Sequence, residues 1–370
     1  MNAKTTNNHP IFGILTIITL VFILYILKSL IIPILYAIIL AVMVFPVQKF
    51  LEHKWRFHRL LATFCSILII FFVMALIAFL VYFQLNSISN NGEDYSKNIS
   101  ELFNNASDYL QQTFNINPND SLLSSDLKIE NIIKNNFDRI GSLLTESGSL
   151  ISNIVLIPIY LFFFLYYRRF FRVFYYKVFR NKSKAFLNKM ISKIYNIQQN
   201  YLIGLIKVIF IVGVLNTIGL LILGIDHAIF FGFFAAILLI IPYIGVIIGS
   251  LIPAIFALAT QDSPLYAVGV IAIFMFIQFL EGNFITPKIT GSQVSINAFI
   301  AILSLIIFSM LWGIAGMIVA LPVTATLKII FDNTPGYEAY GFLIGDPVDK
   351  HLHGRARSRL KIWQEIRSKR

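Results

Sequence analysis

Residues 228–259 read AIFFGFFAAILLIIPYIGVIIGSLIPAIFALA, an apolar stretch interrupted by Pro242, Gly245, Gly249 and Pro253. A transmembrane helix needs about 20 residues to cross the hydrocarbon core of a bilayer. The stretch is therefore too long for one span and too short for two. Each half is about 14–16 residues, or roughly 21–24 Å of helix. The pattern predicts a re-entrant helix hairpin, and one long kinked span is the alternative.

A second stretch, residues 298–331, repeats this shape, with Gly313, Gly316 and Pro322 as its interruption. Paired segments broken by Gly and Pro point to the binding site of a transporter. Unwound backbone at membrane depth is tolerated only where it lines a cavity or is buried in protein. A model with two hairpins and a model with two kinked spans both place the basic C-terminal tail in the cytoplasm. The excess of Lys and Arg in cytoplasmic segments therefore permits either model.

The composition of the chain indicates a membrane protein. Of its 370 residues, 57% are hydrophobic and only 13% charged, whereas soluble domains have about 25% charged residues. We expect an all-α polytopic membrane protein with about six full spans plus two re-entrant hairpins, or eight spans. The net charge of +12 is attributed to topology signals and contacts with lipid headgroups, and no nucleic-acid partner is expected.

Apolar runs and polar segments divide the chain into six parts. These are three N-terminal transmembrane helices in 1–85, a small acidic helical insertion in 86–148, a fourth transmembrane helix in 149–167, a basic interfacial segment in 168–206, a transport core with broken helices in 207–331, and a basic tail in 332–370. Within the first part, Lys28, Ser29 and Pro33 mark a break between two helices, because the first apolar run is too long for one span.

The charges orient these parts. The insertion holds nine of the eighteen acidic residues, whereas Lys and Arg dominate the segment that follows the fourth span. Because an excess of Lys and Arg marks cytoplasmic loops, we expect the insertion outside the cell and both termini in the cytoplasm. Arginines alternate with aromatic residues between Arg168 and Phe179, which is typical of a helix anchored at the lipid interface.

A polar cluster separates the two broken stretches. It contains Gln278, Glu281, Asn283, Thr286 and Lys288, together with the helix breakers Pro287 and Gly291. A carboxylate inside a span costs about 2.5–3.5 kcal/mol at mid-depth, so it usually faces a cavity on a transport pathway. We therefore predict that Glu281 and its polar neighbours contact a solute or an ion. The alternative is a carboxylate at a helix end, paired with Lys288 at the interface.

Three ordered motifs resemble the signature of the autoinducer-2 exporter family of bacterial membrane transporters. They are IPYIGVIIG at 241–249 followed by Pro253, QFLEGN at 278–283 leading to TPK at 286–288 and Gly291, and GIAG at 313–316 followed by ALP at 320–322. The resemblance covers nearly all of residues 11–331. Val246 and Ala298 depart from it, since the family often has Pro at both places.

The resemblance implies a transporter of small solutes: autoinducer-2 in some members, and cations exchanged for protons in others. It also implies a ring-like homo-oligomer in the bacterial cytoplasmic membrane. The chain has no Gly-x-x-x-x-Gly-Lys-Ser/Thr phosphate loop, so we expect transport to run on a gradient.

Three functions follow. The first is an exporter of a small polar solute, the second a monovalent cation/proton antiporter that uses Glu281, and the third a non-transporting scaffold. We expect no enzymatic activity, cofactor or metal. Histidine is absent from the predicted spans, and the single cysteine, Cys65, lies in an apolar run.

Overall fold

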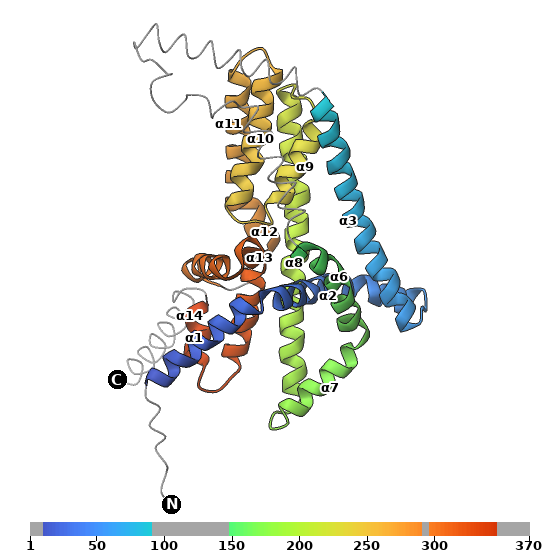
Figure 1. Ribbon diagram of the computed structural model, residues 1–370, viewed down its shortest axis with the longest axis vertical. Helices are drawn as coiled ribbons and strands as arrows, with labels where there is room; N and C mark the ends of the chain where they lie inside the picture. Colours follow the sequence, from blue (N-terminus) through green and yellow to red (C-terminus); the bar gives the residue numbers. More distant parts are fainter. Residues whose placement is uncertain (1–9, 91–147, 291–295, 346–370) are drawn as a thin grey trace, which may run out of the picture. The chain divides into compact units, whose positions relative to one another are not determined.

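The computed structural model describes residues 10–90, 148–290 and 296–345, and these are almost entirely helical (Figure 1). The predicted insertion lies outside the described residues apart from its ends, as do Gly291 and the tail beyond residue 345. The chain divides into two compact units, each taken separately below. The first contains Met1–Val178 and Tyr201–Gly291, and the second Phe179–Asn200 and Ser292–Arg370.

The first part of unit 1 is built from five helices. They are α1 (Pro10–Ile26), α2 (Lys28–Lys54), α3 (Arg59–Asn90), α6 (Gly148–Tyr166) and α7 (Arg168–Val178). The predicted break between the first two helices falls at Leu27, whose φ of −84° and ψ of 16° end the helical repeat. Pro33 lies buried inside α2 and does not break it. α2 packs against α6 and α3 around Ala37, Val44 and Leu161.

One continuous helix, α8 (Lys184–Ile222), runs through the boundary that we expected between residues 206 and 207. The sequence suggested a separate interfacial segment because charged residues precede residue 206 and apolar residues follow it. Charge does not end a helix, however, and the segment contains no proline. The boundary between the two compact units falls instead within α8, between Asn200 and Tyr201.

Residues 228–259 fold as a helix hairpin within unit 1. Its arms are α9 (Ala228–Leu238) and α10 (Ile244–Thr260). The turn between them includes Pro242 and ends at Tyr243, whose φ is +64°. Gly245 lies against Leu238, and Gly249 against Ala235. Residues farther along α10 thus meet residues earlier in α9, so the arms are antiparallel and one kinked span is excluded.

Two expected interruptions are regular helix instead. Gly249 and Pro253 are buried within α10, which stays helical from Ile244 to Thr260. A proline inside a helix removes one hydrogen bond, and its ring crowds the carbonyl of the residue four positions earlier. α10 nevertheless stays helical through Pro253, which is buried in a helix that packs against both α9 and α11. α10 also packs against α11 (Leu265–Leu280), which matches the predicted span of 265–280.

The second broken stretch forms α13 (Ala298–Asp332) in unit 2. The chain turns sharply at Gly313, whose φ of 63° and ψ of −144° are open to glycine but not to other residues. As a consequence, Gly316 lies against the carbonyl of Phe308. In a straight helix these two residues would be about 12 Å apart. Gly316 and Pro322 lie within the following helical segment and do not interrupt it.

The start of the predicted tail also belongs to the folded part of unit 2. α14 (Glu338–Ile344) packs against α13. Asn297 caps α13 by accepting from the N–H of Ile300, and its Nδ2 donates to the carbonyls of Leu343 at 2.6 Å and Gly345 at 2.9 Å.

Five helical segments in the described residues are long and apolar enough to cross a membrane. They are Lys28–Lys54, Arg59–Gln84, Lys184–Ile222, Leu265–Ile289 and Ala298–Asp332. Shorter apolar helices, including both arms of the hairpin, accompany them. The prediction of an all-α polytopic membrane protein is confirmed.

Candidate functional site

The predicted polar cluster lies where α11 changes its winding. After Leu280 the chain continues as a π-helical turn, η1 (Glu281–Ile285), and then as α12 (Thr286–Thr290), which contains Pro287. π-Helical turns are rare and frequently occur at functional sites. The wider winding places Thr286, five residues after Glu281, beside its carboxylate.

Both oxygens of the Glu281 carboxylate accept hydrogen bonds. Gln278 donates through Nε2 to Oε2 at 2.7 Å, and the Thr286 hydroxyl donates to Oε1. Charge-assisted hydrogen bonds of this kind are stronger than neutral ones. The structure therefore brings together three of the five predicted side chains and fixes the carboxylate between two donors.

The other two predicted side chains lie outside this arrangement. Lys288 is exposed and makes no ion pair in the part of the chain that the structure describes. The alternative of a Glu281–Lys288 pair is thus not what the structure shows. Asn283 is exposed as well. Its Nδ2 donates a hydrogen bond to the backbone carbonyl of Phe279 at 2.9 Å, next to the π-helical turn.

A small cavity adjoins this cluster within unit 1, with a volume of about 20 Å³. Its wall includes Gln278 from α11, Asn216 from α8, and Gly245 and Gly249 from α10. A space of this size holds about one water molecule. Gln278 thus stands between the cavity and Glu281, so the cavity and the carboxylate form one polar site.

Asn216 is the polar residue of this site that the sequence analysis missed. Its exposed fraction is 3%, and it lies on the wall of the cavity. An amide in this position can both donate a hydrogen bond to a small polar guest and accept one from it. The sequence does contain a signal for this residue. Its amide lies between two apolar runs, residues 208–215 and 218–222.

Two glycines allow the hairpin to close on this cavity. A Cβ at Gly245 would lie 1.7 Å from the carbonyl oxygen of Leu238, and one at Gly249 would lie 2.9 Å from Cβ of Ala235. Any side chain at either position would force the arms of the hairpin apart. The predicted glycine positions therefore serve close helix packing.

A second polar network ties together the end of α2 and the beginnings of α3 and α7, which are predicted to face the cytoplasm. Gln48 is fully buried and donates to Thr63 Oγ1 at 2.7 Å and to Glu52 at 3.1 Å. Glu52 in turn forms an ion pair with Arg168 at 2.5 Å. This pair could not be predicted from the sequence, because its partners are 116 residues apart.

A comparison with protein-family models places residues 14–336 in a single family, described as AI-2E family transporter. The chain belongs to the AI-2E transporter family. This membership confirms the resemblance based on the three motifs, and it makes the chain a member of a family of membrane transporters.

Relatives within the AI-2E family match most of the chain. A protein of Bacillus subtilis (strain 168) named "Putative transport protein YueF" is 29% identical over 314 residues, covering 83% of this chain and 85% of the relative. "AI-2 transport protein TqsA" of Escherichia coli (strain K12) is 26% identical over 331 residues, covering 86% and 90%. The matched family region, residues 14–336, includes most of the described residues of both compact units.

Proposed function

We propose that this AI-2E family member is a gradient-driven secondary transporter that exports small polar solutes of the autoinducer-2 type. The observation that carries the proposal is the site formed by Glu281, Gln278 and Thr286 beside the cavity at Asn216. Hydroxyl-rich solutes need both donors and acceptors, and two amides and a carboxylate supply them. The name of the E. coli relative, "AI-2 transport protein TqsA", supports this class of solute.

The size of the cavity adds a requirement. At about 20 Å³ it is far smaller than the roughly 300–1,000 Å³ of sites that enclose small organic ligands. A sugar-like solute therefore enters only if the α9–α10 hairpin moves away from α8 and α11. In other transporter folds, alternating access is largely the rocking or gating of one helix bundle against another around a site formed by broken helices.

A cation/proton antiporter is the second candidate, and one observation favours it. The Glu281 carboxylate has two neutral donors and no ion-pair partner among the described residues. In an antiporter this carboxylate would bind a proton and a monovalent cation in turn, and the amide oxygens of Asn216 and Gln278 would be further ligands for the cation.

The expected surroundings of the transporter are part of the same proposal. We place it in the bacterial cytoplasmic membrane, with both termini in the cytoplasm because Lys and Arg are enriched there. A homo-oligomer and contacts with membrane lipids complete this arrangement.

Purified protein in liposomes that contain a pH-sensitive dye separates the two candidates. In one arm an outward gradient of autoinducer-2 is imposed, and in the other Na⁺, K⁺ or Li⁺ is added outside. Solute-dependent proton movement with no response to cations supports the exporter. Movement in response to cations alone overturns the exporter and supports the antiporter, and no movement in either arm contradicts both.

A further inference from the structure

The π-helical turn η1 makes a side-chain contact that an α-helix of the same sequence would not make. The N–H of Thr286 donates to the carbonyl of Glu281, five residues earlier, whereas an α-helix would use the N–H of Ile285. Residues five apart in an α-helix point about 140° away from each other, because each residue turns the helix by about 100°. The hydrogen bond from the Thr286 hydroxyl to the Glu281 carboxylate therefore depends on the π winding.

The other donor to this carboxylate does not depend on the winding. Gln278 lies three residues before Glu281 in the regular helix α11, and residues three apart share one face of a helix. Its bond to Oε2 is thus compatible with either winding, whereas the bond from Thr286 to Oε1 requires the π turn. One oxygen of Glu281 is in this way tied to the winding of the chain.

The winding also decides which side chains of α12 face α8. Ile285 and Ile289 pack against a cluster formed by Val208 and Val212 of α8, Ala236 of α9 and Ile277 of α11. If the π turn became α-helical, the later residues would rotate by about 100°, and each would take the place of the residue after it. The exposed Lys288 would then face the cluster in place of Ile289. Because a buried lysine without a partner is costly, the α-helical winding moves α12 away from α8.

This cluster is continuous with the cavity at Asn216. Val212 and Ile277 belong to both, since they line the cavity and also pack in the cluster with Ile285 and Ile289. Movement of α12 therefore loosens two residues of the cavity wall. The winding after Glu281 is in this way connected to the opening that a solute larger than one water molecule requires.

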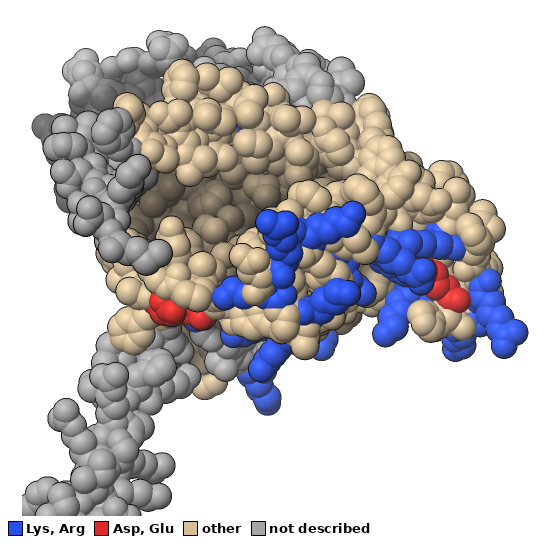
Figure 2. Space-filling view, turned by 90° about the horizontal axis from the view of Figure 1, so that it is seen from below, with Lys and Arg blue, Asp and Glu red and all other residues tan. Residues whose placement is uncertain are grey.

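The groups that donate to Glu281 are neutral. They are a hydroxyl from Thr286 and an amide from Gln278, and neither Lys207 nor Lys288 forms an ion pair within the described part of the chain. The hairpin helices α9 and α10 contain no charged residue. Lys and Arg gather instead on the face that Figure 2 shows from below. A hydroxyl on a neutral solute is the group that most closely reproduces the bond from Thr286.

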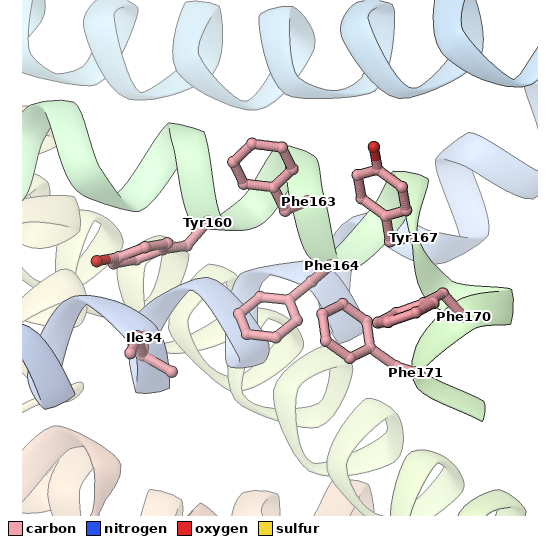
Figure 3. Close-up of a pocket in the computed structure, with 7 residues that line it drawn as sticks. All are labelled: Ile34, Tyr160, Phe163, Phe164, Tyr167, Phe170 and Phe171. Carbon is pink, nitrogen blue, oxygen red and sulfur yellow. The ribbon is translucent and has the colours of Figure 1, made fainter. Parts of the chain in front are cut away.

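A larger hollow in unit 1 does not suit such a solute. It is a groove of about 510 Å³ between α2, α6 and the beginning of α7 (Figure 3). Its lining consists of one aliphatic and six aromatic residues: Ile34, Tyr160, Phe163, Phe164, Tyr167, Phe170 and Phe171. Apolar atoms alone face the space, so they supply neither a donor nor an acceptor for a hydroxyl. The site at Glu281 supplies both.

We propose that the Thr286 hydroxyl holds the place of a solute hydroxyl. During transport, a hydroxyl of a small neutral solute donates to Glu281 Oε1 in place of Thr286, the π turn rewinds as α-helix, and α12 leaves α8 so that the hairpin opens. Release of the solute restores the π turn. Pro287 has no N–H, so the α-helical winding lacks one of its usual bonds and has less advantage over the π winding. This inference rests on the proposed transport function and adds to it the class of solute and the moving element.

Nitroxide labels report the winding without any measurement of transport. Each label is attached to one cysteine of the full chain in liposomes, in a Cys65→Ser background, and its collisions with oxygen are measured by electron paramagnetic resonance. The four labelled variants are Phe284→Cys, Ile285→Cys, Lys288→Cys and Ile289→Cys. We expect protection at 285 and 289 and access at 284 and 288. Thr286→Val removes the hydroxyl and should abolish or reverse this contrast, whereas Thr286→Ser keeps the hydroxyl and should preserve it.

Flux of autoinducer-2 gives a second readout. Without the competing hydroxyl, Thr286→Val should need less autoinducer-2 for half-maximal flux and should show a lower maximal flux. A loss of structure alone does not produce this split. Autoinducer-2 added to the labelled wild type should also reduce the contrast, and this response decides the matter if Thr286→Val does not fold.

The outcomes separate this proposal from the proposed function. A wild-type contrast in folded Thr286→Val overturns the proposal, and so does an unchanged contrast in wild type that is transporting autoinducer-2. Loss of the contrast in Thr286→Val, together with no flux in wild type, supports the change of winding and contradicts the proposed export of autoinducer-2.

Discussion

Gln278 lies one helical turn before Glu281 and donates a hydrogen bond from its Nε2 to the Glu281 Oε2 at 2.7 Å. The same Gln278 lines the cavity that Asn216 faces. This one amide therefore connects the wall of the cavity to a carboxylate whose other oxygen accepts from Thr286. We expect this link to couple occupancy of the cavity to Glu281, and the first prediction tests it.

Asn216→Leu should leave the protein folded and abolish transport. Leucine has the same branching and the same number of side-chain heavy atoms, and it removes the amide from the wall of the cavity. Melting temperature in detergent and flux in liposomes measure the two effects. The control is Asn283→Ala, at an exposed amide that bonds only to backbone. Wild-type transport by Asn216→Leu would show that the cavity is not on the pathway.

Gly245→Ala should destabilise the protein by about 1–3 kcal/mol, because its Cβ would lie 1.7 Å from the carbonyl oxygen of Leu238. Gly282→Ala is the control, since a Cβ there meets nothing within 4 Å. It should leave stability unchanged or raise it by up to about 1 kcal/mol. Thermal unfolding compares the two, and an equal effect of both substitutions would be inconsistent with close packing of the hairpin.

The Glu52–Arg168 ion pair should contribute more to stability than the Lys328–Asp332 pair. The exposed fractions of the first pair are 23% for Arg168 and 14% for Glu52, and it links separate helices, so we expect Glu52→Gln to cost about 1–3 kcal/mol. The second pair lies four residues apart on one helix.

Asp332→Asn should cost only about 0.3–0.5 kcal/mol, as is usual for helical pairs of this spacing. Thermal unfolding of Glu52→Gln, of Arg168→Gln and of the double variant gives the coupling energy of this pair. The Asp332→Asn variant gives the cost for comparison. A coupling of Glu52 with Arg168 that is no larger than the cost of Asp332→Asn would contradict the prediction.

Gln198 should stabilise unit 2, because it links the part of α8 in that unit to α13. Gln198 is buried, and its Nε2 donates to the Pro322 carbonyl at 2.5 Å and to Thr326 Oγ1 at 2.8 Å. Gln198→Leu should lower the free energy of unfolding by about 1–3 kcal/mol, since each bond contributes about 0.5–1.5 kcal/mol. The neighbouring Gln199→Leu makes the same chemical change without these bonds. Equal melting temperatures for the two variants would refute the role of Gln198.

Much of the fold was predictable because span length and charge are local properties of the sequence. The hairpin at residues 228–259, the break near Lys28 and the helix at 265–280 follow from the length of apolar runs and from glycine and proline. The same signals misplaced breaks at Gly249, Pro253 and Pro322. Packing decides whether a helix continues through such residues, and packing involves partners distant in sequence.

The candidate site was predictable only in part, for the same reason. Glu281, Gln278 and Thr286 are close in sequence, so their shared turn was foreseeable from spacing alone. Asn216 joins them through tertiary packing of α8 against the hairpin and α11, across 62 residues from Gln278. The Glu52–Arg168 pair is likewise invisible until α2 and α7 are placed together.

The most direct test of the central claim is the rate of autoinducer-2-dependent proton movement in liposomes for wild type and for Glu281→Gln. The claim is that Glu281, held by Gln278 and Thr286, forms the transport site. Glutamine keeps the size of the side chain but cannot exchange a proton. The account predicts proton movement in wild type and its loss in a folded Glu281→Gln variant. Equal rates in the two proteins would contradict the claim.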